Sequence, residues 1–291
     1  MVSKLEEYIN GIPPTVFNQT TLMDFFWNLR GKHLIHYELD FDNFIIAATM
    51  NNKIEKIKIK YVGKANSKRK EFIRYTCNSP SPFSIGLSLR SKSYLSHNSA
   101  LYIHGLIAKA PKEMCINKEQ SPKEYWNDST LTQVGIDRAF KNKARQSQYI
   151  WKWKRHKFVL LNGKNTGDYG VINITLDDGG NLRTTDIERT LVDIVVRPIY
   201  FGGVNKVIEI YSRAKVRVSI EKIIQTLKSL NHAYPYHQSI GFLMERSGYE
   251  KHKLDKLRNL SVEYDFYLDY NMEDVEYDSN WKLYYPKDLL R

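Results

Sequence analysis

The feature that most constrains this chain is a change from helical to alternating hydrophobicity near residue 53. Residues 4–30 and 41–48 repeat apolar side chains every three or four positions, which is typical of helices with one buried face. Residues 57–61 then alternate apolar residues with lysine, as in a half-buried strand, and a basic loop separates them from a return strand at 71–76. Helices followed by a hairpin with a basic tip are the order of a winged helix-turn-helix domain.

Local signals predict where the two helices begin and end. Thr21 with Asp24 three residues later predicts an N-cap, and Gly31 suits the left-handed residue that ends such a helix. A second helix is expected to begin after Asp40 and to end at Asn51. This second helix is the one expected to enter the major groove of DNA.

Positive charge is concentrated in the hairpin. The chain carries a net charge of +12, and residues 53–74 hold nine Lys or Arg against two Glu, a net charge of +7. This favours a polyanionic partner through counterion release, whereas the alternative interpretation is a solvated lysine face. Because the charges coincide with the wing, we expect double-stranded DNA as the partner. The residues expected to bind it are Asp42, Asn43, Lys53, Lys58, Lys60, Lys64, Lys68, Arg69 and Lys70.

A segment rich in Ser and Pro at residues 78–82 predicts the first domain boundary. Residues 1–78 are expected to form the winged helix-turn-helix domain, and residues 79–291 a larger domain of mixed helices and strands. The fold class expected is therefore α+β. The chain shows no internal repeat.

The second domain contains a marked helix start. Thr185 and Glu188 have the spacing of a capping box, and an apolar stripe follows them until Pro198. Arg189 and Asp193 lie four residues apart and are expected to pair on the surface of this helix. We interpret these residues as structural first and as a partner surface second.

A second basic stretch covers residues 137–157, with eight Lys or Arg against one Asp. Tyr149, Trp151 and Trp153 alternate within it, so three interpretations stay open: stacking on single-stranded nucleic acid, a strand packed on the core, or a surface for an acidic protein. The residues expected to form a partner or nucleic-acid surface are Arg138, Lys141, Lys143, Arg145, Lys152, Lys154, Arg155, Arg189 and Arg197. Residues 262–281 carry seven acidic residues and no Lys or Arg, and are expected to face away from nucleic acid.

No pattern in the sequence indicates a catalytic site, a metal site or a cofactor. His97 and His104 lie seven residues apart, but no carboxylate has ligand spacing to them, and neither HExxH nor CxxC occurs. No Walker loop, dinucleotide fingerprint or GxSxG elbow is present. We therefore expect a protein that is not an enzyme.

Composition predicts a cytoplasmic location. The two cysteines, Cys77 and Cys115, form no redox or metal pattern and are interpreted as reduced, packed thiols. No apolar run approaches the roughly 18–20 residues of a membrane span, and the first residues lack the apolar core of a secretion signal.

Three segments together resemble the AbiEi family, the antitoxins of type IV toxin–antitoxin and abortive-infection modules. Residues 94–106 are similar to the family's SALxxHGL helix, and residues 183–193 with the glycines at 202–203 are similar to its next helix start and the turn after it. Residues 238–249 resemble a third helix that ends at a glycine. The chain differs from the family in a long insertion at 110–160.

The resemblance implies an N-terminal winged helix that represses its own promoter at inverted repeats. It also implies a C-terminal domain that neutralises a nucleotidyltransferase-like toxin. The alternative function is a phage-defence nuclease, or another nucleic-acid-processing enzyme, that docks on DNA through the winged helix. A third possible function is the binding of RNA or of a partner protein, through a surface centred on residues 137–157. If the purified protein turns over plasmid DNA in the presence of a divalent metal, the enzyme is favoured over the antitoxin.

Overall fold

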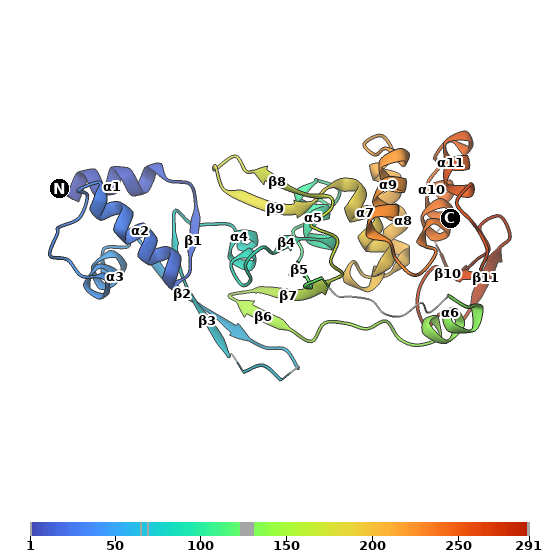
Figure 1. The fold of residues 1–291 in the computed structure, drawn as a ribbon, viewed down its shortest axis with the longest axis horizontal. Helices are drawn as coiled ribbons and strands as arrows, with labels where there is room; N and C mark the ends of the chain where they lie inside the picture. Colours follow the sequence, from blue (N-terminus) through green and yellow to red (C-terminus); the bar gives the residue numbers. More distant parts are fainter. Residues whose placement is uncertain (1, 65, 69, 123–130, 290–291) are drawn as a thin grey trace.

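A computed structural model describes residues 2–64, 66–68, 70–122 and 131–289. The molecule is mixed α/β and elongated, with helices from the N-terminal segment at one end and the C-terminal helices and a small sheet at the other (Figure 1). A large curled sheet lies between them. Residues 2–78 form α1 (Val2–Gly11), β1 (Thr15–Phe17), α2 (Gln19–Gly31), α3 (Phe41–Met50), β2 (Glu55–Tyr61) and β3 (Glu71–Cys77).

The remaining elements follow in two groups. The first is α4 (Pro82–Leu87), β4 (Tyr94–Leu95), α5 (His97–Ile103), β5 (Glu113–Glu119), α6 (Gln133–Phe140), β6 (Ile150–Trp153), β7 (His156–Gly163), β8 (Val171–Thr175) and β9 (Asn181–Thr185). The second is α7 (Ile187–Val196), the 3-10 helix η1 (Pro198–Tyr200), α8 (Val204–Ala214), α9 (Ile220–Leu230), α10 (Tyr236–Arg246), α11 (Lys251–Arg258), β10 (Phe266–Tyr267), β11 (Val275–Asp278) and β12 (Leu283–Pro286).

The large sheet runs through both halves of the chain. Within the described residues it has nine strands in the order β1-β3-β2-β6-β7-β5-β4-β9-β8. The hairpin of β2 and β3 joins the rest where β2 pairs with β6 in antiparallel register, Lys60 opposite Lys152 and Tyr61 opposite Trp151. Because this pairing crosses residue 78, the hairpin and the later strands share one hydrogen-bonded sheet. The division of the chain into domains at that residue stays a prediction.

Four apolar clusters occur among the described residues, the smallest of them formed by Cys115, Val159 and Leu161 on β5 and β7. One is built by α1–α3 with β1 and β3, around Phe26 and Phe44. The second lies under the large sheet, where Ile57 and Ile59 of β2 pack with Phe158 of β7. The third and largest joins α5–α11 with the small sheet, around residues such as Trp281. Ile57 and Ile59 thus belong to the core of the later strands and not to that of the N-terminal helices.

The predicted helix starts are partly confirmed. Helix α3 begins after Asp40, as expected, because the Asp40 side chain accepts a hydrogen bond from the backbone N–H of Asn43. Ser219 caps α9 in the same way. The expected cap at Thr21 was wrong. Asn18 is the N-cap of α2, and Thr21 is the N3 residue whose side chain completes the capping box. Gly31 is also not left-handed, since it is the last residue of α2 and the left-handed residue is His33.

The connection at residues 78–82 is ordered: the Asn78 side chain donates to the carbonyls of Ile9 and Ile12, and Ser81 caps α4. Near the C-terminus, residues 262–270 contain the two-residue strand β10. Short strands in this region pair with β12, whose side chains complete the third core.

Candidate nucleic-acid interface

The hairpin of β2 and β3 separates apolar from charged residues. Ile57 and Ile59 are 3% and 0% exposed, whereas Lys58 and Lys60 on the other face point to solvent. The alternation expected from the sequence is therefore confirmed. It leaves one face of β2 free for lysine side chains while the other face closes the core.

Three lysines from three adjacent strands lie side by side on this solvent face. Lys60 of β2 is directly opposite Lys152 of β6, which in turn is opposite Lys157 of β7. Opposite residues of an antiparallel pair point to the same face, with Cβ atoms roughly 4.5–5.5 Å apart. All three are exposed. Lys60 is also opposite Glu71 of β3, and Lys157 contacts Glu113 of β5 at 2.8 Å. We call these three residues the lysine row; it joins two basic stretches that are far apart in sequence.

The hairpin tip adds further exposed cations. Lys64, Lys68 and Lys70 are exposed, and the Lys70 ammonium lies 5.8 Å from the centre of the Tyr61 ring. Arg69 lies outside the described residues. The tip follows directly on β2, the strand that carries Lys60 of the lysine row, so the two groups of cations are continuous along the chain.

Two cations counted in the hairpin contribute less to this surface. Lys53 forms an ion pair with Glu6 of α1, which neutralises it. Arg74 is buried, and its guanidinium donates to the carbonyl oxygens of Ser88 and Ile73. The charge that faces solvent is therefore smaller than the sequence count.

The start of α3 holds the two residues expected to read bases. Asp42 and Asn43 are both exposed in the first turn. The Asp40 carboxylate accepts the backbone N–H of Asn43 at 2.8 Å and its side-chain Nδ2 at 2.7 Å. These hydrogen bonds hold the pKa of Asp40 below its usual value. They also fix the orientation of the Asn43 amide.

The second basic stretch is divided between two places in the fold. Trp151 is buried, and its ring lies 5.2 Å from that of Tyr61 and 4.5 Å from that of Phe72. Of the three interpretations of this stretch, a strand packed on the core is therefore the one that holds for Trp151. Figure 1 shows α6, at the start of the stretch, beside the small C-terminal sheet and away from the hairpin. The exposed members of the expected surface are Arg138, Lys141, Lys143, Arg145, Lys152, Lys154 and Arg155.

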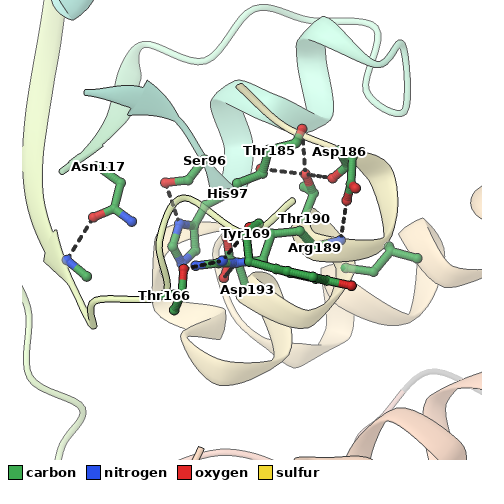
Figure 2. A network of polar contacts seen from close by, with 12 residues as sticks. Ser96, His97, Asn117, Thr166, Tyr169, Thr185, Asp186, Arg189, Thr190 and Asp193 are labelled. Carbon is green, nitrogen blue, oxygen red and sulfur yellow. Dashed lines mark hydrogen bonds and ion pairs between the residues drawn. The ribbon is translucent and has the colours of Figure 1, made fainter. Parts of the chain in front are cut away.

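Arg189 is not part of that surface, because it is 4% exposed. Figure 2 shows its side chain within a polar network: Nε donates to Asp193 at 2.9 Å, and Nη1 donates to the carbonyl of Tyr169 at 2.9 Å. Thr166 accepts a third, longer hydrogen bond from the same nitrogen. The expected pair of Arg189 and Asp193 is real, but its surface location was wrong.

The cap of α7 also differs from the prediction. Asp186 is the N-cap, since its carboxylate accepts the backbone N–H of Arg189 at 2.8 Å, while Thr185 is the last residue of β9. Glu188 does not complete a capping box. It is buried and forms an ion pair with Lys222 of α9 at 2.9 Å, which ties the two helices together.

A cavity of about 700 Å³ lies beside this network, and no pattern in the sequence indicates it. The half-buried Arg197 lines it, together with the network residues Arg189 and Asp193. His97 and His232, which lie far apart in the sequence, also line it. The sequence gives no signal for a shared site, because the tertiary packing of α5 and α9 on α7 is what brings these segments together.

Neither a metal cluster nor a membrane span occurs within the described residues. No group of three or more His, Cys, Asp or Glu among them could hold a metal ion. Of the described helices, none is long and apolar enough to cross a membrane.

Comparison with solved structures finds a similar fold. No protein-family model and no curated protein sequence matches the chain. The crystal structure of the RV2827C protein from Mycobacterium tuberculosis is similar, with a TM-score of 0.54 and 14% sequence identity. The match covers 97% of this chain and 89% of that chain. At this identity the likeness shows that the two proteins share a fold over nearly the whole of this chain.

Proposed function

We propose that this protein binds double-stranded DNA through the hairpin of β2 and β3 and the adjoining strands β6 and β7. The observation that carries the proposal is the lysine row. Like charges directly opposite each other in a sheet lower stability, by about 0.2–1 kcal/mol per pair. Duplex phosphates would neutralise the row and release their counterions, which turns this local cost into binding free energy.

In this proposal residues 1–78 act as a winged helix-turn-helix, with α2 and α3 as the helix pair and the hairpin as the wing. Asp42 and Asn43 then lie at the end of α3 that reaches base edges. Because Asp40 holds one N–H of the Asn43 amide, the other N–H and the carbonyl oxygen of that amide are presented in one orientation. This is the donor and acceptor pair that suits adenine.

The regulatory role rests on the resemblance to AbiEi antitoxins. The protein would repress its own promoter at inverted repeats and neutralise a nucleotidyltransferase-like toxin, with residues 79–291 responsible for neutralisation. Because the sheet crosses residue 78, the two roles are best separated by surface substitutions in the full chain and not by cutting it.

The test compares two charge-matched triple variants. K64A/K68A/K70A removes the hairpin tip, and K228A/K251A/K287A removes three exposed lysines from the C-terminal end of the molecule. Each variant is scored for repression of its own promoter and for growth beside the product of the adjacent gene. We expect the tip variant alone to lose repression, and both variants to keep protection from the toxin. If the tip variant represses as well as its control, the wing does not contact DNA.

A further inference from the structure

The cavity beside the Arg189 network has the size of a small-molecule site. Its volume is about 700 Å³, and ligand pockets of about 300–1,000 Å³ are usual. It is bounded by the start of α5, the ends of β7 and α7, and the segments 145–149 and 232–236. These boundaries lie apart from the lysine row, so the cavity is a separate site.

Three buried polar atoms on the cavity wall lack a hydrogen-bond partner among the described residues. They are Nε2 of His97, Nε2 of His232 and Oδ2 of Asp193. His97 and Asp193 are 6% and 8% exposed. Buried polar atoms are normally paired, so these three point to groups that a ligand supplies.

The chemistry of these atoms restricts the ligand. A carboxylate oxygen accepts only, so the ligand must bring a hydroxyl or amino donor to Asp193. Burial lowers the pKa of His97 to about 4. The pKa of His232, which also lines the cavity, is lowered to about 4 for the same reason. Both rings are therefore neutral at pH 7 and can pack against an uncharged part of the ligand.

The charge of the lining favours an anion. Asp193 is its only carboxylate within the described residues, and it is already paired with Arg189. Arg145 and Arg197 have no carboxylate partner in the described part of the chain, and the Lys164 ammonium bonds to the backbone carbonyls of Leu230 and Asn231. Guanidinium groups suit a phosphate group, because their N–H donors match its oxygens in bidentate hydrogen bonds.

Tyrosine rings complete the lining. Tyr149 is 38% exposed and has no ring partner among the described residues, so one face of it is free to stack. Tyr200, Tyr234 and Tyr270 also line the cavity. A ligand with an aromatic ring would gain from these contacts, since stacking on tyrosine does not depend on the identity of the base.

We infer that the cavity is a binding site for a nucleoside phosphate, with the phosphate at Arg145 and Arg197, the base among the tyrosines, and a hydroxyl or amino group donated to Asp193. A nucleoside phosphate combines the anion, the ring and the donors that the lining requires. The inference does not rest on the proposed function, because the residues of the lysine row take no part in it.

Calorimetry on the full chain tests this, with AMP, CMP, GMP and UMP as probes. Adenosine and inorganic phosphate serve as probes that lack one half of the ligand. We expect at least one nucleotide to bind and both halves to bind at least about tenfold more weakly, since a charge-assisted hydrogen bond contributes roughly that factor or more. A phosphorylated dinucleotide separates two possible ligands. If it binds more tightly than every mononucleotide, the natural ligand is the end of a nucleic-acid strand; if it binds more weakly, the natural ligand is a free nucleotide.

Variants locate the site. R145M and R197M should each weaken nucleotide binding about tenfold or more, and R145M is expected to fold normally because Arg145 is exposed. R138M is the matched control, since Arg138 is exposed on α6 and does not line the cavity. K60A/K152A should also bind nucleotide normally, even if it loses DNA. The inference is overturned if no nucleotide binds, if adenosine binds as well as AMP, or if R145M and R197M bind like R138M.

Discussion

Substitution of Gly63 by alanine tests whether the hairpin is docked on the later strands. A Cβ at this position would lie 2.0 Å from the carbonyl oxygen of Gln148 and 2.8 Å from the backbone nitrogen of Ile150. Both atoms belong to the backbone, so neither can rotate away and the hairpin must separate from β6. Two hydrogen bonds are then lost: Val62 N–H to the Ile150 carbonyl at 2.9 Å, and the Tyr61 hydroxyl to the Gln148 carbonyl at 3.2 Å.

The expected loss follows from these contacts. Two hydrogen bonds at about 0.5–1.5 kcal/mol each give a destabilisation of about 1–3 kcal/mol. Forcing an extra methyl group into a packed site costs about the same amount. Urea unfolding followed by circular dichroism and tryptophan fluorescence measures the change in the free energy of unfolding.

Gly31→Ala is the control, because Gly31 ends α2 and nothing lies within 4 Å of the position that a Cβ would take there. Alanine in a helix should leave stability unchanged or raise it, by up to about 1 kcal/mol. Equal stabilities of Gly63→Ala and Gly31→Ala would refute the close approach of the hairpin to β6, and with it the sheet that continues across residue 78.

Three further outcomes are expected. Gly241→Ala should lower the free energy of unfolding by about 1–3 kcal/mol in urea, because its Cβ would lie 2.2 Å from the fully buried ring of Trp281. Arg189→Met leaves the buried Asp193 without its ion pair, so thermal and urea unfolding should show a loss of about 3–5 kcal/mol. Burial lowers the pKa of the His97 imidazole to about 4, whereas the pKa of histidine in an unfolded chain is about 6.5, so on acidification the unfolded chain binds a proton before the folded one does. The free energy of unfolding should therefore fall as the pH drops from about 6.5 to 4, and it should fall less in His97→Asn.

Local signals in the sequence were sufficient for several elements. Asp40 before an apolar stripe predicted the start of α3, and the alternation from Ile57 to Tyr61 predicted β2 with its lysines facing solvent. Each of these depends on residues that are neighbours along the chain. Helix capping and strand alternation are set at that range, so no knowledge of the tertiary structure was needed.

The pairing of β2 with β6 could not be predicted in the same way. Strand register between distant segments depends on which faces pack together, and periodicity carries no information on the partner. The two basic stretches were therefore treated as separate surfaces, although Lys60 and Lys152 are neighbours. The cavity was missed for a similar reason, because His97 and Asp193 are brought to one wall only by the packing of α5 on α7.

The wrong prediction of the cap of α7 has a different origin. Thr185 and Asp186 can both cap a helix, and Thr185 has the better spacing to Glu188. The structure uses Asp186 because β9 continues through Thr185 and pairs with β8 there. Glu188 is then free to pair with Lys222, which links α7 to α9. A competing tertiary contact thus decided between two acceptable local solutions.

The salt dependence of DNA binding by K60A/K152A tests the central claim most directly. The control is K228A/K251A, which changes the net charge equally at exposed positions on α9 and α11. The double substitution relieves the repulsion between Lys60 and Lys152 but also removes the lysine opposite Glu71 of β3, so urea unfolding of both variants accompanies the titrations. On a plot of log affinity against log salt concentration, we expect the slope of K60A/K152A to be shallower than that of the control by about two units, roughly 0.9 per lost phosphate contact. Identical slopes for the two variants would contradict the assignment of this sheet face to DNA.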